Sequence, residues 1–273
     1  MRAAYEKTPA FRNRVEKEYI YLDERVNICF MVFQGSIFNI FPRDHRDKAW
    51  YQPGADTEEY SGGDSLFVRN GFQLMLQSVA EQKYTDANQI LQAVGTFQQK
   101  FGGELIPSET KKSIEITYNQ INPFKRVFPW YLLLGFFLLV VLFVNIFRQK
   151  PLPKYLRMAF VGGIVILFLV HTAGLVLRWY ISGHAPWSNG YESVVYVAWA
   201  VMLAGLIFGR KYAMVIGTAS LLTGIALFVA HLSWMNPEIT PLVPVLKSYW
   251  LTIHVAIITA SYGFIGLSMF LGI

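Results

Sequence analysis

Residues 158–180 have the sequence MAFVGGIVILFLVHTAGLVLRWY, and this stretch decides the fold class. Its only charged side chain is Arg178, close to its end. A helix of about 20 mostly apolar residues is long enough to cross the hydrocarbon core of a bilayer. The stretch is therefore predicted to be a membrane-spanning helix.

Other parts of the chain share this character, at residues 128–147, 191–209, 212–233 and 249–272. Over the 273 residues, 53% are hydrophobic and 15% are charged, whereas soluble domains carry about 25% charged residues. This composition excludes an ordinary soluble enzyme and a disordered chain. The expected fold is a polytopic α-helical membrane protein with five transmembrane helices.

Charge is distributed in a way that predicts the orientation of these helices. Residues 1–126 carry 16 basic and 16 acidic side chains, whereas residues 127–273 carry 8 basic and 2 acidic ones. Six of these eight basic residues lie in the short connections 148–157 and 210–211. Short cytoplasmic connections are enriched in Lys and Arg, so both are expected on the inner side. A nucleic-acid site would need a basic, soluble face, and none is expected.

Residues 1–126 are then expected outside the membrane, together with the later loops 181–190 and 233–248. We predict that this N-terminal region is α+β. Its apolar stretches 27–40 and 65–79 are candidate strands. Cys29, the only cysteine, lies in the first of them and is expected to be a buried structural residue rather than a reactive one.

Two helices are also expected in the N-terminal region. The first runs from Asp86 as N-cap to Lys100, with Gly102 as its stop signal. The second follows Ser108 as a candidate cap and ends before Asn122-Pro123, where the first membrane helix approaches. Five tryptophans are expected near outer helix ends as an interfacial belt, namely Trp130, Trp179, Trp187, Trp234 and Trp250.

The histidines are the residues of this sequence that suggest a ligand-binding site. His45 lies in the charged segment RDHRDK and is expected on a solvated surface. The other four, His171, His184, His231 and His254, all fall in the outer half of the membrane or beyond it. Neutral imidazole is a common axial ligand of haem iron, but a lone membrane histidine also forms hydrogen bonds with neighbouring helices. Position alone leaves both interpretations open.

Two spacings add to this pattern. Trp250 and His254 are four residues apart and therefore share one helix face, where a flat ring would suit a planar macrocycle. Arg178 follows His171 by seven residues and lies on the same face. Arg178 has three possible roles: an ion pair with Glu192, a contact with a haem propionate, or snorkelling to the lipid headgroups. Snorkelling is the expected one.

The two segments RWYISGHAPWSNGYESVVYVAW (178–199) and VPVLKSYWLTIHVAIITASYGF (243–264) resemble a known family. It is the CcsA or ResC type of haem-handling membrane protein, from the System II cytochrome c synthetase. The matching residues are Ser182, Gly183, His184, Pro186, Ser188, Asn189, Tyr191, Glu192, Ser193, Trp250, Leu251, His254 and Val255.

This resemblance implies cytochrome c biogenesis in the bacterial cytoplasmic membrane. Haem b would be delivered across the membrane and held at the periplasmic face for attachment to the CxxCH motif of apocytochrome c. His254 would be an axial ligand of the haem iron beside Trp250. His184 would be a motif residue on the same side, and His171 and Arg178 stay candidates for haem contact from their positions alone. The implied partners are apocytochrome c, haem, a ResB-type module, membrane lipid and a thiol-reducing protein.

The resemblance also implies a domain order. Residues 1–126 would be the C-terminal region of a ResB-type module, 127–157 a membrane helix with its basic connector, and 158–273 the first part of the CcsA/ResC-type domain. The family's tryptophan-rich segment and second external histidine are expected beyond Ile273. Its other membrane histidine is expected before Met1. The chain is thus expected to be a fragment of a fused synthetase, and synthetase activity of the chain itself is left open.

Three alternatives remain at this point. A transporter would need polar residues through the inner half of the helices, where the fourth offers only Thr218, Ser220 and Thr223. A haem b anchor would need paired histidines deep in facing helices, and only His171 is well inside. A membrane scaffold without synthetase activity needs neither feature.

Overall fold

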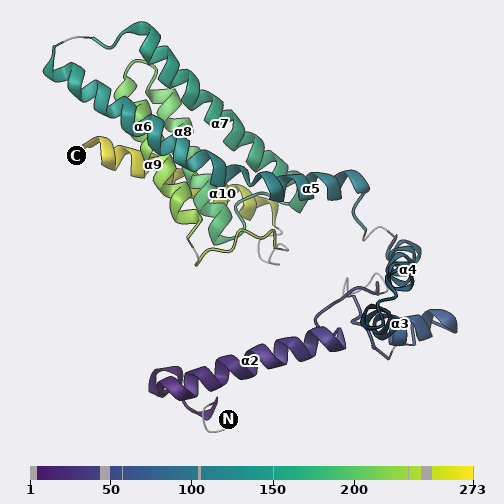
Figure 1. Cartoon of the computed structure of the whole chain (residues 1–273). Coiled ribbons are helices and arrows are strands. Elements are labelled where there is room, and N and C mark those ends of the chain that lie inside the picture. The colour runs from purple at the N-terminus through teal and green to yellow at the C-terminus, as the bar shows by residue number, and fades with distance from the viewer. Residues whose placement is uncertain are drawn as a thin grey trace. The chain divides into compact units, whose positions relative to one another are not determined.

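The computed structural model describes residues 5–43, 50–56, 58–103, 106–149, 151–232, 234–240 and 248–272. The chain divides into two compact units, Met1–Ser108 and Glu109–Ile273. Figure 1 shows both as arrangements of helices. His45 lies outside the described residues.

The N-terminal unit contains a short 3₁₀ helix, η1 (Pro9–Phe11), and three α-helices, α2 (Arg14–Gln34), α3 (Gly63–Ala80) and α4 (Tyr84–Gly102). Its small core is largely aromatic and consists of Phe41, Tyr60, Val68 and Phe97. The rings of Phe41 and Phe97 meet edge to face with centroids 5.3 Å apart. This core therefore joins α3 and α4 to the segment that precedes them.

The prediction of an α+β region is wrong, because the described residues contain no strand. The first candidate strand lies mostly in α2, the second lies within α3, and only an isolated bridge joins Phe41 to Tyr51. Local signals explain the helix: Asn13 and Glu16 form a capping box at the start of α2, and Gly35 ends it with a φ of 78°. Apolar runs of this length fit either structure.

Cys29 differs from its prediction for the same reason. It lies on α2, where Ile20 is the only buried residue among those described, and the cysteine is exposed. The predicted helix around Asp86–Lys100 is confirmed as α4, with two differences at its start. It begins at Tyr84, and Lys83 rather than Asp86 occupies the N-cap position. Helix ends are the least certain part of such predictions, because the cap depends on loop geometry.

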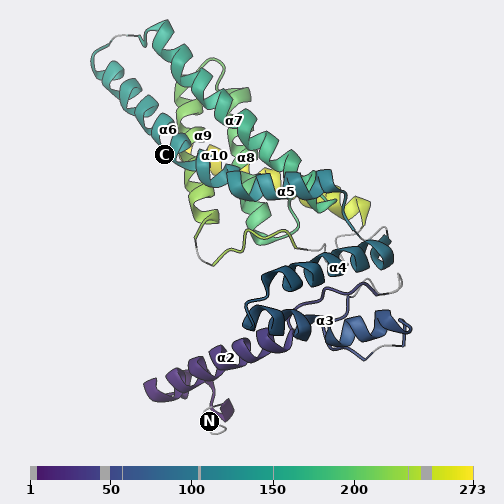
Figure 2. The same cartoon turned by 45° about the vertical axis from the view of Figure 1, so that its right-hand side comes forward.

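The second unit is a helical bundle. It contains α5 (Glu109–Ile121), α6 (Pro123–Phe147), α7 (Lys154–Ser182), α8 (Gly190–Phe208), α9 (Ala213–Ala230) and α10 (Tyr249–Gly272). Five helices of the described chain are long and apolar enough to cross a membrane, with α5 and α6 counted as one stretch. The five predicted spans are confirmed, and the protein is an integral membrane protein. Figure 2 shows α6 to α10 gathered in one bundle.

Small residues allow the helices to approach closely. A Cβ atom on Gly135 of α6 would lie 2.6 Å from the backbone nitrogen of Leu221 in α9. A Cβ atom on Gly205 of α8 would lie 2.2 Å from that of Ala219 in α9. Such contacts stabilise membrane helices, because lipid supplies no hydrophobic force between them. They hold α9 between α6 and α8.

The two basic connections lie at the same end of the bundle. A guanidinium nitrogen of Arg157, in the first turn of α7, donates to the backbone oxygen of Arg210 at 2.7 Å. The opposite end contains the end of α7, the start of α8, residues 234–240 and the start of α10. This opposite end is called the predicted outer end below.

Candidate functional site

A buried ion pair forms the centre of the predicted outer end. Nε of Arg178, near the end of α7, donates to a carboxylate oxygen of Glu192 in the first turn of α8 at 2.8 Å. The side chains are 2% and 0% exposed. The other carboxylate oxygen accepts from both the backbone nitrogen (2.9 Å) and the hydroxyl (2.7 Å) of Ser188. Each charge is thus compensated by several hydrogen bonds, as burial requires.

Arg178 also holds a loop from a distant part of the sequence. Its two terminal nitrogens donate to the backbone oxygens of Pro237 (2.9 Å) and Glu238 (3.0 Å). Its guanidinium carbon lies 5.2 Å from the centre of the Tyr191 ring. Snorkelling, the role we expected, is therefore wrong for this residue. Its acceptors are the buried carboxylate of Glu192 and two backbone carbonyls.

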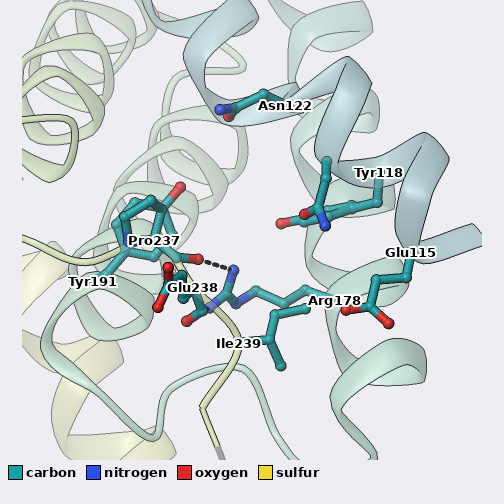
Figure 3. Close-up of a pocket in the computed structure, with 9 residues that line it drawn as sticks. Glu115, Tyr118, Asn122, Arg178, Tyr191, Pro237, Glu238 and Ile239 are labelled. Atoms are coloured by element: carbon teal, nitrogen blue, oxygen red, sulfur yellow. Dashed lines mark hydrogen bonds between the residues drawn. The ribbon is translucent and has the colours of Figure 1, made fainter. Parts of the chain in front are cut away.

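A polar cavity of about 370 Å³ lies beside this ion pair. Figure 3 shows Glu115, Tyr118 and Asn122 on one side and Tyr191, Pro237 and Glu238 on the other, with Arg178 between them. The ends of α5, α7 and α8 therefore meet residues 234–240 around one polar space. Glu192 already compensates the charge of Arg178.

The loop between α7 and α8 (residues 183–189) is held by its own side chains and by the next loop. The amide oxygen of Asn189 caps α8 by accepting from the Glu192 backbone nitrogen at 2.8 Å. One ring nitrogen of His184 lies 3.2 Å from the oxygen of Ala185, and the other lies 3.1 Å from the oxygen of Thr240. Each imidazole nitrogen thus lies close to a carbonyl oxygen, and the neutral ring can donate to one of the two.

Trp187 connects this loop to α10. Its indole nitrogen donates to the backbone oxygen of Thr252 at 3.2 Å. Its ring packs against Tyr196 and Trp179, with centroids 4.7 and 6.1 Å away. An apolar groove of about 520 Å³ runs between this loop and α10, and His184 and Trp187 are among its lining residues.

His254 and Trp250 lie on an exposed face of α10, as predicted from their spacing. Trp250 is 77% exposed and His254 is also exposed. Neither is among the residues that line the groove. Within the described part of the chain, His254 has no hydrogen-bond partner. The imidazole is therefore available at the start of a membrane helix.

The remaining two histidines are inside the bundle. His171 is fully buried, its ring 5.4 Å from that of Phe124 and 6.1 Å from that of Tyr131. Neither of its ring nitrogens has a hydrogen-bond partner among the described residues. His231 caps the end of α9, and its Nδ1 lies 2.7 Å from the oxygen of Leu227. The structure thus brings His184 and Arg178 to one site and leaves His171 and His254 apart from it.

Sequence reasoning did not identify the roles of Trp187 and Ser188. Both lie in the segment 178–199, where Ser188 is a matching motif residue and Trp187 is not, and a tryptophan near a helix end is normally assigned to the membrane interface. The other four belt tryptophans are exposed where the interface is predicted, whereas Trp187 is partly buried. The capping signal S-N-x-x-E was the one local indication that this loop is fixed to α8.

Comparison with known proteins identifies part of the chain. Residues 187–273 match the family model described as Cytochrome C assembly protein. This range contains α8, α9, α10 and the last three residues of the loop before α8. The second of the two segments on which the resemblance rests therefore lies inside the match.

Curated relatives extend the likeness. Protein NrfI of Wolinella succinogenes is 42% identical over 268 residues, which is 97% of this chain and 29% of that protein. The cytochrome c biogenesis protein CcsA of Prochlorococcus marinus (strain MIT 9303) is 45% identical over 107 residues, 38% of this chain and 34% of that protein. CcsA of Synechococcus sp. (strain CC9311) is 42% identical over 99 residues, 34% of this chain and 32% of that protein. The chain thus spans about a third of these relatives or less.

Proposed function

We propose that this chain is the part of a System II cytochrome c synthetase that presents a haem ligand at the outer face of the bacterial cytoplasmic membrane. The match of residues 187–273 to the cytochrome C assembly family carries this proposal. The match directly supports a role in cytochrome c assembly. Haem b and apocytochrome c as ligand and partner follow from that role.

The exposed imidazole of His254 supports the finer assignment. An axial ligand must have a nitrogen free to face the iron, and His254 is exposed with no hydrogen-bond partner in the described part of the chain. Trp250, on the same face, would pack against the macrocycle. His171, His184 and Arg178 stay predictions for haem contact. His171 is fully buried, whereas the polar groups of His184 and Arg178 lie against other partners.

The chemistry of attachment belongs to haem and the thiols of the CxxCH motif. Each thiol adds across a vinyl group: sulfur bonds to one vinyl carbon and hydrogen to the other. This addition uses every atom of the thiol and the vinyl group, and it needs neither an oxidant nor a reductant. The protein contributes position, because holding two reactants in one geometry replaces an encounter with an intramolecular step.

The domain order and orientation belong to the same proposal. Residues 1–126 would be ResB-like, 127–157 a membrane helix with its connector, and 158–273 the CcsA/ResC-type part. The hydrogen bond between Arg157 and Arg210 supports the orientation, because it brings both basic connections to one end of the bundle. That end would face the cytoplasm.

The test is His254→Ala in the gene product purified from membranes. We expect loss of the bound-haem absorption and of cytochrome c maturation, and recovery of the absorption when imidazole is added. Tyr262→Ala is the control, because Tyr262 is 61% exposed on the same helix, and it should change neither. An unchanged spectrum with normal maturation in His254→Ala would remove His254 from the mechanism. Absence of haem from the wild type would favour a scaffold or transporter.

A further inference from the structure

We infer that Trp187 is a positioning residue, which fixes the start of α10 and thereby the location of His254. The buried ion pair of Arg178 and Glu192 anchors the loop that carries Trp187. This inference rests on the proposed function, because it assigns the residues that place the haem ligand.

The first step concerns how α10 is attached to the bundle. Within the membrane, α10 approaches α8 at Gly263, where a Cβ atom would lie 3.1 Å from the backbone oxygen of Val197. Gly263 is about two and a half turns from His254. Further along, α10 also packs on α8 and α9, where Leu267 is part of the bundle core. Trp187 supplies a contact close to the start of the helix, at Thr252, two residues before His254.

The second step concerns the rigidity of Trp187 itself. Its ring contacts the rings of Trp179 in α7 and Tyr196 in α8, and Tyr196 stacks in turn on Trp199 with centroids 5.8 Å apart. The Trp187 ring is therefore packed against aromatic side chains of the bundle. These ring contacts restrict the indole, so that its N–H is directed towards one acceptor.

The third step is the anchoring of the loop that carries Trp187. Ser188, the next residue, donates twice to Glu192, and Glu192 is paired with Arg178. The same guanidinium holds Pro237 and Glu238. One buried cation thus fixes both loops of the predicted outer end. A lysine would keep the charge, but it lacks the planar fork that makes three bonds in fixed directions.

His184 completes this arrangement rather than acting as a ligand. Its two ring nitrogens lie against the oxygens of Ala185 and Thr240. Asn189 lies 3.5 Å from the hydroxyl of the same Thr240. The motif that carries the resemblance therefore holds the neighbouring loop and α10, and leaves the free imidazole to His254.

The experiment compares two matched tryptophan variants in the intact gene product. Trp187→Phe keeps an aromatic ring and removes only the donor to Thr252. Trp130→Phe makes the same replacement at a tryptophan of α6 that is 58% exposed and does not belong to the aromatic row beside Trp187. A net hydrogen bond corresponds to about a fivefold change in an equilibrium. We expect Trp187→Phe to lower haem bound per folded protein by about this factor, and Trp130→Phe to leave it unchanged.

Added imidazole distinguishes positioning from a general loss of stability. It should restore the wild-type absorption to Trp187→Phe, because the haem lacks a correctly placed ligand and not a binding surface. Arg178→Lys should show the same restorable loss. Equal haem occupancy in Trp187→Phe and wild type would overturn the inference. If His254→Ala also left the spectrum unchanged, the proposed function would fall as well; if that variant lost haem, only the positioning role would fall.

Discussion

The two ends of the bundle are built in different ways. At the end with the basic connections, short segments join α6 to α7 and α8 to α9. A hydrogen bond from Arg157 to Arg210 links these two connections. At the predicted outer end, Arg178, Glu192, His184 and Trp187 interlock two loops and α10. Basic residues suffice to orient a membrane protein, whereas placing a ligand requires a rigid frame of buried polar contacts.

The largest expected effect concerns which end faces outwards. Cys29 is the only cysteine of the chain and is exposed. If the N-terminal unit lies outside, a membrane-impermeant maleimide should label Cys29 in intact spheroplasts, and Cys29→Ser should abolish labelling of the peptide that contains this position. Labelling that appears only after the membrane is permeabilised would reverse the assignment of the two ends.

Breaking the buried ion pair should have the next largest effect. Arg178→Gln leaves Glu192 buried and uncompensated, which costs about 3–5 kcal/mol. We expect a large drop in the midpoint of thermal unfolding in detergent. Replacing both residues with apolar ones should recover most of this loss, because such replacements are often neutral. If Arg178→Gln were as stable as wild type, the stability of the predicted outer end would not depend on this ion pair.

A smaller effect is expected at Ser188. Ser188→Ala removes the hydroxyl that donates to Glu192 at 2.7 Å and keeps the backbone donor. Hydrogen bonds to charged groups contribute about 1.5–3 kcal/mol, and we expect the lower part of this range because one donor remains. Unfolding in detergent measures it, with Ser261→Ala on α10 as the control. Equal losses in the two variants would argue against a special role for the loop.

The smallest effect is expected at the opposite end. Arg157→Ala removes the exposed hydrogen bond to Arg210, and surface substitutions change stability by about 0.5 kcal/mol or less. The midpoint of unfolding should stay close to that of wild type. A loss as large as that of Arg178→Gln would mean that both ends are rigid frames and would remove the contrast between them.

Much of the bundle could be predicted because its signals are local. Five apolar runs gave five spans, and Asn122-Pro123 marked the junction of α5 and α6, where Asn122 has a φ of 42°. The same approach failed in the N-terminal unit. An apolar run such as 27–40 becomes a strand only where another strand pairs with it, and the capping box at Asn13 favoured a helix.

Candidate residues could be named from the sequence, but their partners could not. The spacing of Trp250 and His254 fixed their shared face, because both lie on one helix. Arg178 contacts Pro237 and Glu238, about 60 positions further along the chain. The spacing of residues within one helix cannot predict such a contact. An arginine near a helix end has the same sequence pattern whether it is buried or snorkels.

The sequence by itself therefore determined the membrane class, the number of spans and the end at which each basic connection lies. These properties depend on the transfer of each segment between water and lipid, which is a sum over neighbouring residues. Only the tertiary structure decided that Arg178 is buried against Glu192 and that Trp187 contacts α10. A buried polar group must find its partner wherever the fold brings one, because leaving it unpaired costs more than almost any local preference.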